Sequence, residues 1–231
     1  MIAATVALSL VHLGRAALPG ANAPGVKPPL LVLLHGVGAN ERAIHPIAAA
    51  FDPRYEVVSA RSPVALGPDA YGWFHVQFTP TGPVIDAAEA RAGWALLARF
   101  IDEAVVAYGA DPSRVHVVGF SQGGIMALAG LLTAPDRIAG AVVMSGRLLP
   151  EVLPFAAPHE ALRGKPLLIV HGTGDQKLGV HFARSARQAL GVFPLDLTYD
   201  EQPMGHEITR ESLARVAEWC TALLDRPTSR A

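Results

Sequence analysis

The sequence predicts an α/β fold in which a mostly parallel central sheet carries helices on both faces. Short apolar runs, typical of strands buried on both sides, alternate along the chain with longer segments of helical spacing. Hydrophobic residues make up 51% of the 231 residues, which is enough for a sizeable core. No repeat or change of composition divides the chain, so residues 1–231 are expected to form a single domain.

The expected elements follow one another in a strand–helix alternation. Strands are predicted at the apolar runs 30–34, 55–60, 115–118, 139–144, 166–170 and 195–199. Helical spacing predicts helices at 44–51, 180–190 and 207–224. A long helix is expected from the capping residue Asp86 to about Tyr108, and another from the glycines after Ser121 to about Thr133. Such an alternation is what covers both faces of a parallel sheet with helices.

Three segments lack a regular pattern. Residues 14–29 are rich in Gly, Pro, Ala and Asn and are expected to form a loop. The stretch 61–83 carries an aromatic group at 71–74, and an irregular loop of that length in a compact domain is usually functional. Residues 146–163 contain several prolines and fit either a cap over a site or a packed connection, and the sequence leaves both open.

The apolar start of the chain, from Ile2 to Val11, lacks the basic residues that precede a signal-peptide core and is too short to cross a bilayer as a helix. Alternation through Val6, Leu8 and Leu10 instead predicts a strand. We therefore expect a cytoplasmic protein without stable membrane insertion.

The charge balance and the cysteine content limit the binding partners and the thiol chemistry to be expected. With 19 Lys and Arg against 20 Asp and Glu, the net charge of −1 gives no electrostatic reason to expect nucleic acid or an anionic membrane as partner. The single cysteine, Cys220, lies on a helical apolar pattern and is expected to be a buried thiol. A homodimer is compatible with the sequence, which neither requires nor excludes it.

The pentapeptide Gly119-Phe120-Ser121-Gln122-Gly123 stands where an apolar strand must turn into a helix. A serine on such a turn projects its hydroxyl beyond the sheet edge, and glycines on both sides let the backbones of strand and helix pass closely. The context predicts a nucleophile elbow with Ser121 as nucleophile. A chance match to the pattern is the alternative.

A serine nucleophile needs a base, and the base needs an acid that orients it. After such an elbow the acid and then the base follow in chain order. Only His181 and His206 follow a plausible acid downstream of Ser121. We choose His206 because it lies in a loop directly after the last strand, whereas packing fixes the direction of His181 on a helix.

Asp175 is the expected acid, because a flexible turn after the strand 166–170 can aim its carboxylate at His206 along the sheet edge. Alternatively, this carboxylate caps the turn itself. Three other aspartates fit less well, since they follow the elbow helix or lie on the last strand: Asp136, Asp196 and Asp200.

A tetrahedral oxyanion needs backbone N–H donors. The residue after the nucleophile usually supplies one, which here is Gln122, and the loop after the strand 30–34 supplies the other, which points to Val37. His35 and His171, each before a glycine at a strand end, are interpreted as hydrogen-bonded supports of their loops. No histidine or carboxylate spacing is typical of a zinc site, so no metal or other cofactor is expected.

Together these residues resemble a known family. The matching stretches are Leu34-His35-Gly36-Val37-Gly38-Ala39-Asn40, Trp73-Phe74, Gly119 to Gly124, His171-Gly172-Thr173-Gly174-Asp175 and Gly205-His206-Glu207-Ile208. They are similar to the signatures of the phospholipase/carboxylesterase family of α/β-hydrolases, which includes acyl-protein thioesterases. The resemblance implies an α/β-hydrolase fold and a serine esterase with Ser121, Asp175 and His206 as nucleophile, acid and base. It also implies an oxyanion hole formed by the amides of Val37 and Gln122.

Two positions depart from the family pattern. His75 follows Trp73-Phe74 where the family often has aspartate, and Gln176-Lys177-Leu178-Gly179 follows Asp175 where the family often has valine and proline. The second departure changes the wall beside the site, so the family's acyl-chain preference does not carry over.

The expected function is hydrolysis of short to medium acyl or aryl carboxylic esters, with Trp73, Phe74 and Leu148 contacting the substrate. An acyl-protein or lysophospholipid thioesterase is the alternative within the class, and a peptidase or lactonase on the same scaffold is not excluded. The rival from another class is a binding protein that keeps the fold as a pocket. The intact order of Ser, Asp and His argues against it.

Overall fold

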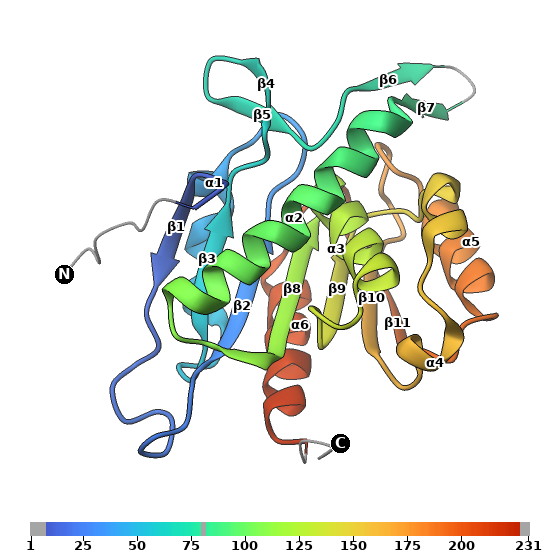
Figure 1. Ribbon diagram of the computed structural model, residues 1–231. Helices are drawn as coiled ribbons and strands as arrows, with labels where there is room; N and C mark the ends of the chain where they lie inside the picture. Colours follow the sequence, from blue (N-terminus) through green and yellow to red (C-terminus); the bar gives the residue numbers. More distant parts are fainter. Residues whose placement is uncertain (1–7, 80–81, 227–231) are drawn as a thin grey trace.

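Seven strands form the central sheet, in the order β1-β3-β2-β8-β9-β10-β11 (Figure 1). The computed structural model describes residues 8–79 and 82–226. The strands are β1 (His12–Arg15), β2 (Pro29–Leu34), β3 (Glu56–Ala60), β8 (Asp111–Phe120), β9 (Gly140–Met144), β10 (Pro166–Gly172) and β11 (Asp196–Gln202). All neighbours pair in parallel except β1, which pairs antiparallel with β3. The mostly parallel α/β fold predicted from the sequence is therefore confirmed.

Helices cover both faces of this sheet, as Figure 1 shows. One face carries α2 (Ala87–Ala107), α3 (Gln122–Thr133) and α5 (His181–Leu190), and the other carries α1 (Glu41–Ile44), the following 3-10 turn η1 (His45–Ala50) and α6 (Arg210–Leu224). Each face has its own apolar core cluster, and strands β2, β8, β9 and β10 contribute alternate residues to the two clusters. Continuous apolar runs are needed for these strands because both of their sides are buried.

The helix ends follow from local capping chemistry. Asp86 begins α2, since its carboxylate accepts hydrogen bonds from the amides of Ala88 and Glu89, as the sequence predicts. Helix α6 begins at Arg210 rather than Glu207, because Thr209 and Ser212 form a reciprocal capping box that defines its first turn.

The strand predicted at the start of the chain is not found where alternation placed it. Residues 1–7 lie outside the described part, and Leu8 to Val11 do not form a strand. The edge strand is β1, which begins only at His12, and His12 is paired with Ala60. The polar His12 is buried there because its ring bonds the Leu10 carbonyl at 3.0 Å and the Tyr108 hydroxyl at 2.7 Å. Burial of a satisfied histidine is invisible to an apolar alternation pattern.

The stretch 61–83 is more regular than the sequence indicates. It contains the ribbon β4 (Val64–Gly67) with β5 (Ala70–Gly72), and most of a second ribbon, β6 (Val76–Thr79) with β7 (Gly82–Ile85). Both ribbons lie beyond the edge of the sheet where the parallel strands end (Figure 1). Strands of three or four residues are too short to give a readable period, which is why the sequence appears irregular.

Residues 146–163 form a packed connection and not a cap. They contain the 3-10 turn η2 (Pro150–Phe155) and the short helix α4 (His159–Leu162). Leu149, Val152 and Leu162 are buried in the core cluster beneath α3. The Ala157 amide also bonds the carbonyl of Leu132 at the end of α3. The apolar residues that made a cap plausible are thus used for packing.

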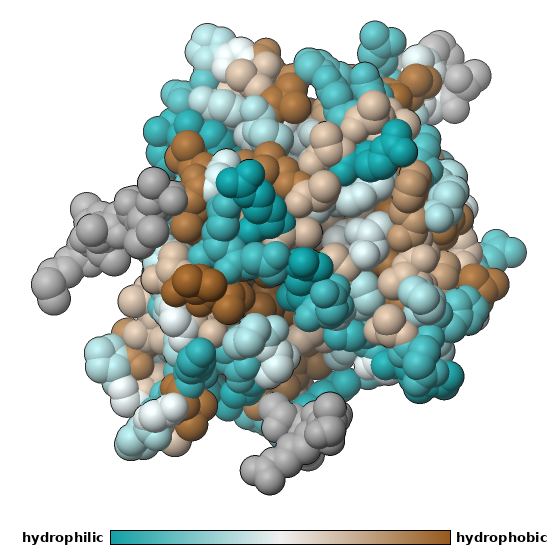
Figure 2. Space-filling model, in the orientation of Figure 1, coloured by the Kyte–Doolittle hydropathy of each residue, from teal (hydrophilic) through white to brown (hydrophobic). Residues whose placement is uncertain are grey.

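The large apolar side chains that are exposed on the described surface are scattered and do not mark a docking site for a macromolecular partner. Large exposed apolar side chains lie on different elements, including Val84 on β7, Val106 on α2 and Phe155 on η2. Hydrophilic and hydrophobic residues are interspersed on the face in Figure 2. Single exposed apolar residues of this kind are normal for a protein surface. Within the described residues, no helix has the length and apolar content needed to cross a bilayer.

A buried histidine on a strand of the central sheet makes stability depend on pH. The Nδ1 atom of His116 on β8 lies 2.7 Å from the Tyr55 hydroxyl, which donates to the Cys220 carbonyl at 3.1 Å. His116 is 5% exposed, and burial lowers the pKa of its imidazole from 6.5 to about 3. Cys220 is fully buried, as expected, and burial raises the pKa of its thiol.

Acidification is expected to destabilise the fold through His116. Between about pH 3 and 6.5 the unfolded chain binds a proton that the folded chain does not, so the stabilisation present above pH 6.5 is lost as the pH falls. The loss from pH 7 to pH 5 is about 2 kcal/mol. Urea unfolding at the two pH values checks this, with His116→Asn as the matched variant that cannot titrate. An equal pH dependence in both proteins would contradict the expectation.

Candidate active site

Ser121 occupies a strained turn between the central strand β8 and helix α3. Its backbone has φ 53° and ψ −117°, a conformation that costs a non-glycine residue on the order of 1–3 kcal/mol. The flanking glycines are required sterically. A Cβ at Gly119 would lie 2.1 Å from the Gly123 carbonyl oxygen, and one at Gly123 would lie 2.2 Å from the Leu34 carbonyl oxygen. The predicted strand–turn–helix geometry is present, with its strain at the serine.

His206 and Asp175 meet Ser121 at this turn. The Nε2 atom of His206 lies 2.9 Å from the Ser121 hydroxyl, and its Nδ1 lies 2.7 Å from an Asp175 carboxylate oxygen. Because an ionised carboxylate only accepts, the imidazole proton is on Nδ1 and Nε2 is free to accept the serine proton. Residues separated by 85 and 31 positions in the chain thus form one continuous hydrogen-bonded series.

The Asp175 carboxylate is fully buried and held from two sides. Its Oδ1 accepts from the amides of Lys177 and Leu178, each at 2.9 Å, while Oδ2 faces His206. The turn-capping role weighed in the sequence and the contact with His206 therefore coexist in one side chain. His171 supports the same loop, since its Nε2 donates to the Leu178 carbonyl at 2.7 Å and burial lowers the pKa of its ring.

The loop that carries His206 is fastened to the loop that carries Asp175. The amide of Thr173 donates to the Gln202 carbonyl at 2.8 Å, and that of Gly174 donates to the Met204 carbonyl at 3.1 Å. Phe120 packs against the His206 imidazole, with the ring centres 5.0 Å apart. These contacts restrict the imidazole to the position between Asp175 and Ser121.

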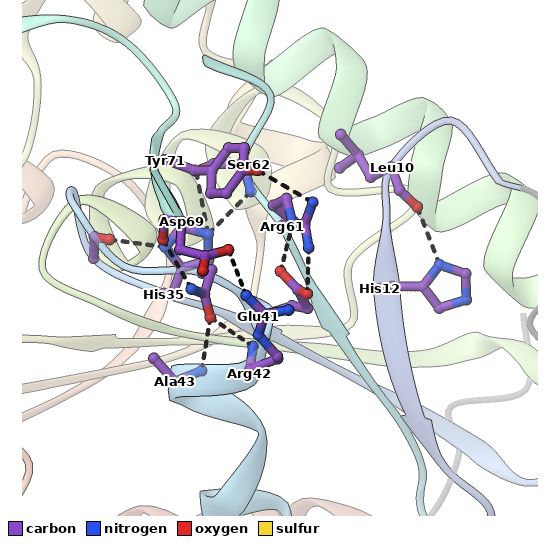
Figure 3. Close-up of polar contacts among 12 residues, drawn as sticks. Leu10, His12, His35, Glu41, Arg42, Ala43, Arg61, Ser62, Asp69 and Tyr71 are labelled. Carbon is purple, nitrogen blue, oxygen red and sulfur yellow. Dashed lines mark hydrogen bonds and ion pairs between the residues drawn. The ribbon is translucent and has the colours of Figure 1, made fainter. Parts of the chain in front are cut away.

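The loop after β2, which carries Val37, is fixed by a separate polar network (Figure 3). His35 donates from Nδ1 to the Gly36 carbonyl at 2.8 Å and accepts from the Ser62 amide at Nε2, 3.0 Å away. Burial lowers the pKa of this imidazole, which suits the neutral form that such bonding requires. The expected supporting role of His35 agrees with these contacts.

Two further contacts tie the Val37 loop to the ribbon β4–β5. The Gly38 amide donates to the Tyr71 carbonyl at 2.8 Å, and the Tyr71 amide donates to the Ala39 carbonyl at 2.9 Å. Glu41 and Arg61 form a doubly hydrogen-bonded ion pair beneath, at 2.6 Å for each contact (Figure 3). Within the described residues the amides of Val37 and Gln122 have no hydrogen-bond acceptor, so both remain free to donate.

A cavity of about 450 Å³ opens beside Ser121 and His206. Its apolar wall comes from Val37, Phe74, Val76, Pro83, Ile85, Phe120, Ile125 and Leu178, and its polar lining includes Gln122, Arg147 and Lys177. Sequence reasoning identified Phe74 but not Ile125, Arg147 or the ribbon β6–β7. The position of Arg147, just after β9, is the one signal that could have indicated it, because the carboxyl ends of parallel strands share one edge.

Two residues expected to contact substrate do not line this cavity. Trp73 is 1% exposed and packs beneath the ribbon, against Gly93 of α2. Leu148 packs against the apolar core on the α3 side of the sheet. The chain bends at these two residues, between β5 and β6, so that Trp73 is turned inward while Phe74 lines the cavity. The aromatic pair therefore divides between core and site.

His75, the first of the two positions that depart from the pattern expected from the resemblance, pairs with the first turn of α2. Its amide donates to a Glu89 carboxylate oxygen at 2.7 Å, and its Nδ1 lies 2.8 Å from the same oxygen. His75 is exposed, and its neighbours Phe74 and Val76 face the cavity. Glu89 thus anchors the segment that forms one cavity wall.

The Gln122 side chain has a role that its sequence motif did not reveal. It is buried, its Oε1 accepts from the Trp73 amide at 2.7 Å, and its Nε2 donates to the Phe74 carbonyl at 2.8 Å. Both hydrogen bonds of one amide group thus hold the segment that carries Phe74 against the elbow.

Replacing Gln122 by alanine is expected to reduce the free energy of unfolding by about 3 kcal/mol, because two buried backbone groups lose their partners. Urea denaturation measures the loss. Gln188→Ala, on the exposed side of α5, is the matched control and is expected to change stability by less than about 0.5 kcal/mol. Similar losses in the two variants would show that the contacts of Gln122 add nothing.

The sheet order and the strained serine after the central strand are those of the α/β-hydrolases. A sequence profile described as Phospholipase/Carboxylesterase matches residues 22–224, so the chain belongs to the phospholipase/carboxylesterase family.

Named relatives and a solved structure agree with this membership. Esterase YpfH of Escherichia coli (strain K12) is 30% identical over 194 residues, which are 80% of this chain and 78% of the relative. Carboxylesterase SOBER1 of Arabidopsis thaliana is 28% identical over 208 residues, 82% and 88% of the two chains. The crystal structure of a carboxylesterase from Mesorhizobium loti has a TM-score of 0.76 at 25% identity, and the match covers 95% of this chain and 96% of that one.

Proposed function

We propose that the chain is a serine carboxylesterase that hydrolyses short to medium acyl or aryl esters through an acyl-enzyme on Ser121. The observation that carries the proposal is the hydrogen-bonded series from Asp175 through His206 to Ser121 at the wall of an open apolar cavity. Membership in the phospholipase/carboxylesterase family supports the same reaction. The proposal requires no metal or cofactor, because the chain itself supplies nucleophile, base and oxyanion donors.

The first half-reaction uses these groups in turn. As the Ser121 oxygen bonds to the ester carbonyl carbon, its proton moves to Nε2 of His206, and the Asp175 carboxylate stabilises the resulting imidazolium. The carbonyl oxygen becomes an oxyanion, which the amides of Val37 and Gln122 stabilise by hydrogen bonds. When the tetrahedral intermediate collapses, the alcohol leaves with the proton from Nε2. Water then repeats these steps on the acyl-enzyme and releases the acid.

The size and lining of the cavity support the substrate range. Phe74, Ile85 and Ile125 present apolar surface to an acyl or aryl group, and a volume of about 450 Å³ lies within the range of small-ligand pockets. A thioester would be attacked by the same groups, so the thioesterase alternative differs from the proposal in chain length and leaving group rather than in mechanism.

The proposal is tested with 4-nitrophenyl esters of graded acyl length, from butyrate through octanoate and laurate to palmitate. We expect kcat/KM to be highest for butyrate or octanoate and to fall for the longer chains. A preference for palmitate would contradict the substrate range and favour the thioesterase alternative. Absence of turnover with every ester would contradict the proposed reaction itself.

We further propose that residues 1–231 act as a single domain in the cytoplasm on a small-molecule ester. The near-neutral charge and the single buried cysteine support these assignments. The same charge balance is the basis for expecting no nucleic-acid partner. A secreted location, found by fractionation of cells that express the full chain, would contradict the cytoplasmic assignment.

A further inference from the structure

The cavity beside Ser121 has an unbalanced charge. Arg147 and Lys177 are the basic residues that line it besides His206, and among the described residues that line it none is Asp or Glu. The rest of the lining is mainly apolar. A neutral ester needs no such charges, because the oxyanion is already served by backbone amides. The two cations therefore call for a separate explanation.

Arg147 is half-buried, and the only carboxylate that interacts with it electrostatically in the described part of the chain, that of Glu151, is not in ion-pair contact with it. Its guanidinium lies 5.6 Å from the centre of the Phe182 ring and donates one long hydrogen bond, 3.4 Å, to the Pro83 carbonyl. No ion pair joins it to any acid within residues 8–79 and 82–226. Burial lowers the pKa of this group, yet an arginine remains charged at neutral pH. A partly desolvated charge with free N–H donors is costly unless a ligand compensates it.

Lys177 comes from a different loop. It is exposed, lines the same cavity and also lacks an ion pair in the described part of the chain. Its backbone amide is bound to Asp175, which fixes where the side chain starts. The chain before Arg147 passes close to the nucleophile, because a Cβ at the preceding Gly146 would lie 3.2 Å from the Ser121 carbonyl oxygen. Arg147 thus starts close to Ser121 in space, and Lys177 starts two residues after Asp175 in the chain.

We propose that the substrate is an ester bearing a second, anionic group, a carboxylate or a phosphate, that Arg147 and Lys177 bind while the apolar wall holds the remainder. This inference rests on the proposed esterase function and specifies its substrate class. The planar guanidinium can bind either oxyanion with two parallel hydrogen bonds, and Lys177 adds a mobile charge at the opening of the cavity. The anion is bound but does not react, so it acts on affinity and orientation.

The test compares esters that differ only in this charge. Mono-4-nitrophenyl adipate carries a free carboxylate, its methyl ester is the neutral match, and 4-nitrophenyl 5-phosphonopentanoate, with the same four methylenes, separates phosphate-like from carboxylate recognition. For wild type we expect kcat/KM for at least one anionic ester to exceed that for the neutral ester by about tenfold. Added NaCl is expected to reduce the preference, since it screens the exposed Lys177.

Substitutions at the two basic residues show whether they cause the preference for anionic esters. Arg147→Met is expected to lower the ratio of anionic to neutral kcat/KM about tenfold, mainly through KM, and Lys177→Met about threefold. Arg147→Lys keeps the charge but not the two parallel hydrogen bonds of the guanidinium, so it should retain part of the ratio. It replaces the methionine variant in the test if that variant does not fold. Lys27→Met, an exposed lysine in the loop before β2 and outside the cavity, is the matched control and should keep the ratio.

Two results overturn the inference while leaving esterase function intact. One is equal kcat/KM for anionic and neutral esters in wild type. The other is a preference that stays at the full wild-type ratio both in Lys177→Met and in Arg147→Met, or in Arg147→Lys where the methionine variant does not fold. If wild type hydrolyses none of the three esters, the proposed esterase function fails and this inference fails with it. The neutral ester separates these cases, because its turnover depends only on the proposed esterase reaction.

Discussion

Ser121→Ala is expected to lower kcat/KM for 4-nitrophenyl butyrate by about 10⁵-fold, to the level left by the oxyanion donors and substrate binding. The hydroxyl is the atom that bonds to the carbonyl carbon, and it is the group 2.9 Å from Nε2 of His206. Nothing else in the described cavity offers a comparable nucleophile, since Cys220 is buried in the core on the opposite side of the sheet.

The matched control for this variant is Ser185→Ala on the exposed side of α5, which should retain full activity. Near-native circular dichroism of Ser121→Ala would show that the loss is chemical, because alanine is tolerated at the strained turn about as well as serine. Retention of more than about 1% of wild-type kcat/KM would mean that another group attacks the ester.

Asp175→Asn is expected to lower kcat by about 10⁴-fold while leaving the fold intact. The amide oxygen would still accept from the amides of Lys177 and Leu178, so the NH₂ group would face Nδ1 of His206. An imidazole facing a donor at Nδ1 keeps its proton on Nε2, where it points at the Ser121 hydroxyl and cannot take a proton from it. The loss of activity is thus caused by a change in the tautomer of His206.

Steady-state hydrolysis of 4-nitrophenyl butyrate measures the effect. Asp200→Asn on β11 is the control, because this aspartate was the nearby alternative in the sequence and bonds Gln202 instead of His206. Its kcat should stay within about threefold of wild type. Comparable losses in both variants would contradict the assignment of Asp175.

The features that could be predicted from the sequence are those imposed by local sterics or by chain order. The elbow needs glycine at 119 and 123 because a side chain there would overlap backbone, so the requirement is visible in the residues themselves. The positions of Asp175 and His206 followed from the rule that carboxyl ends of parallel strands share an edge. The structure brings both within hydrogen-bond distance of their partners.

The features that could not be predicted depend on contacts between distant segments. Gln122 was chosen for its backbone amide, and nothing in the motif indicates that its side chain holds Trp73 and Phe74, which lie 49 and 48 residues away. The opposite directions of those two aromatic residues are likewise set by packing on α2. Arg147 and Lys177 lie near each other only because β9 and β10 are neighbours in the sheet.

The central claim, that Ser121 is an activated nucleophile, is tested most directly by intact-mass spectrometry after reaction with a fluorophosphonate probe. The account predicts one adduct per chain in folded wild-type protein, located by peptide mapping at Ser121, and none in Ser121→Ala. Absence of an adduct in folded wild type, or an equal adduct in Ser121→Ala, would contradict it.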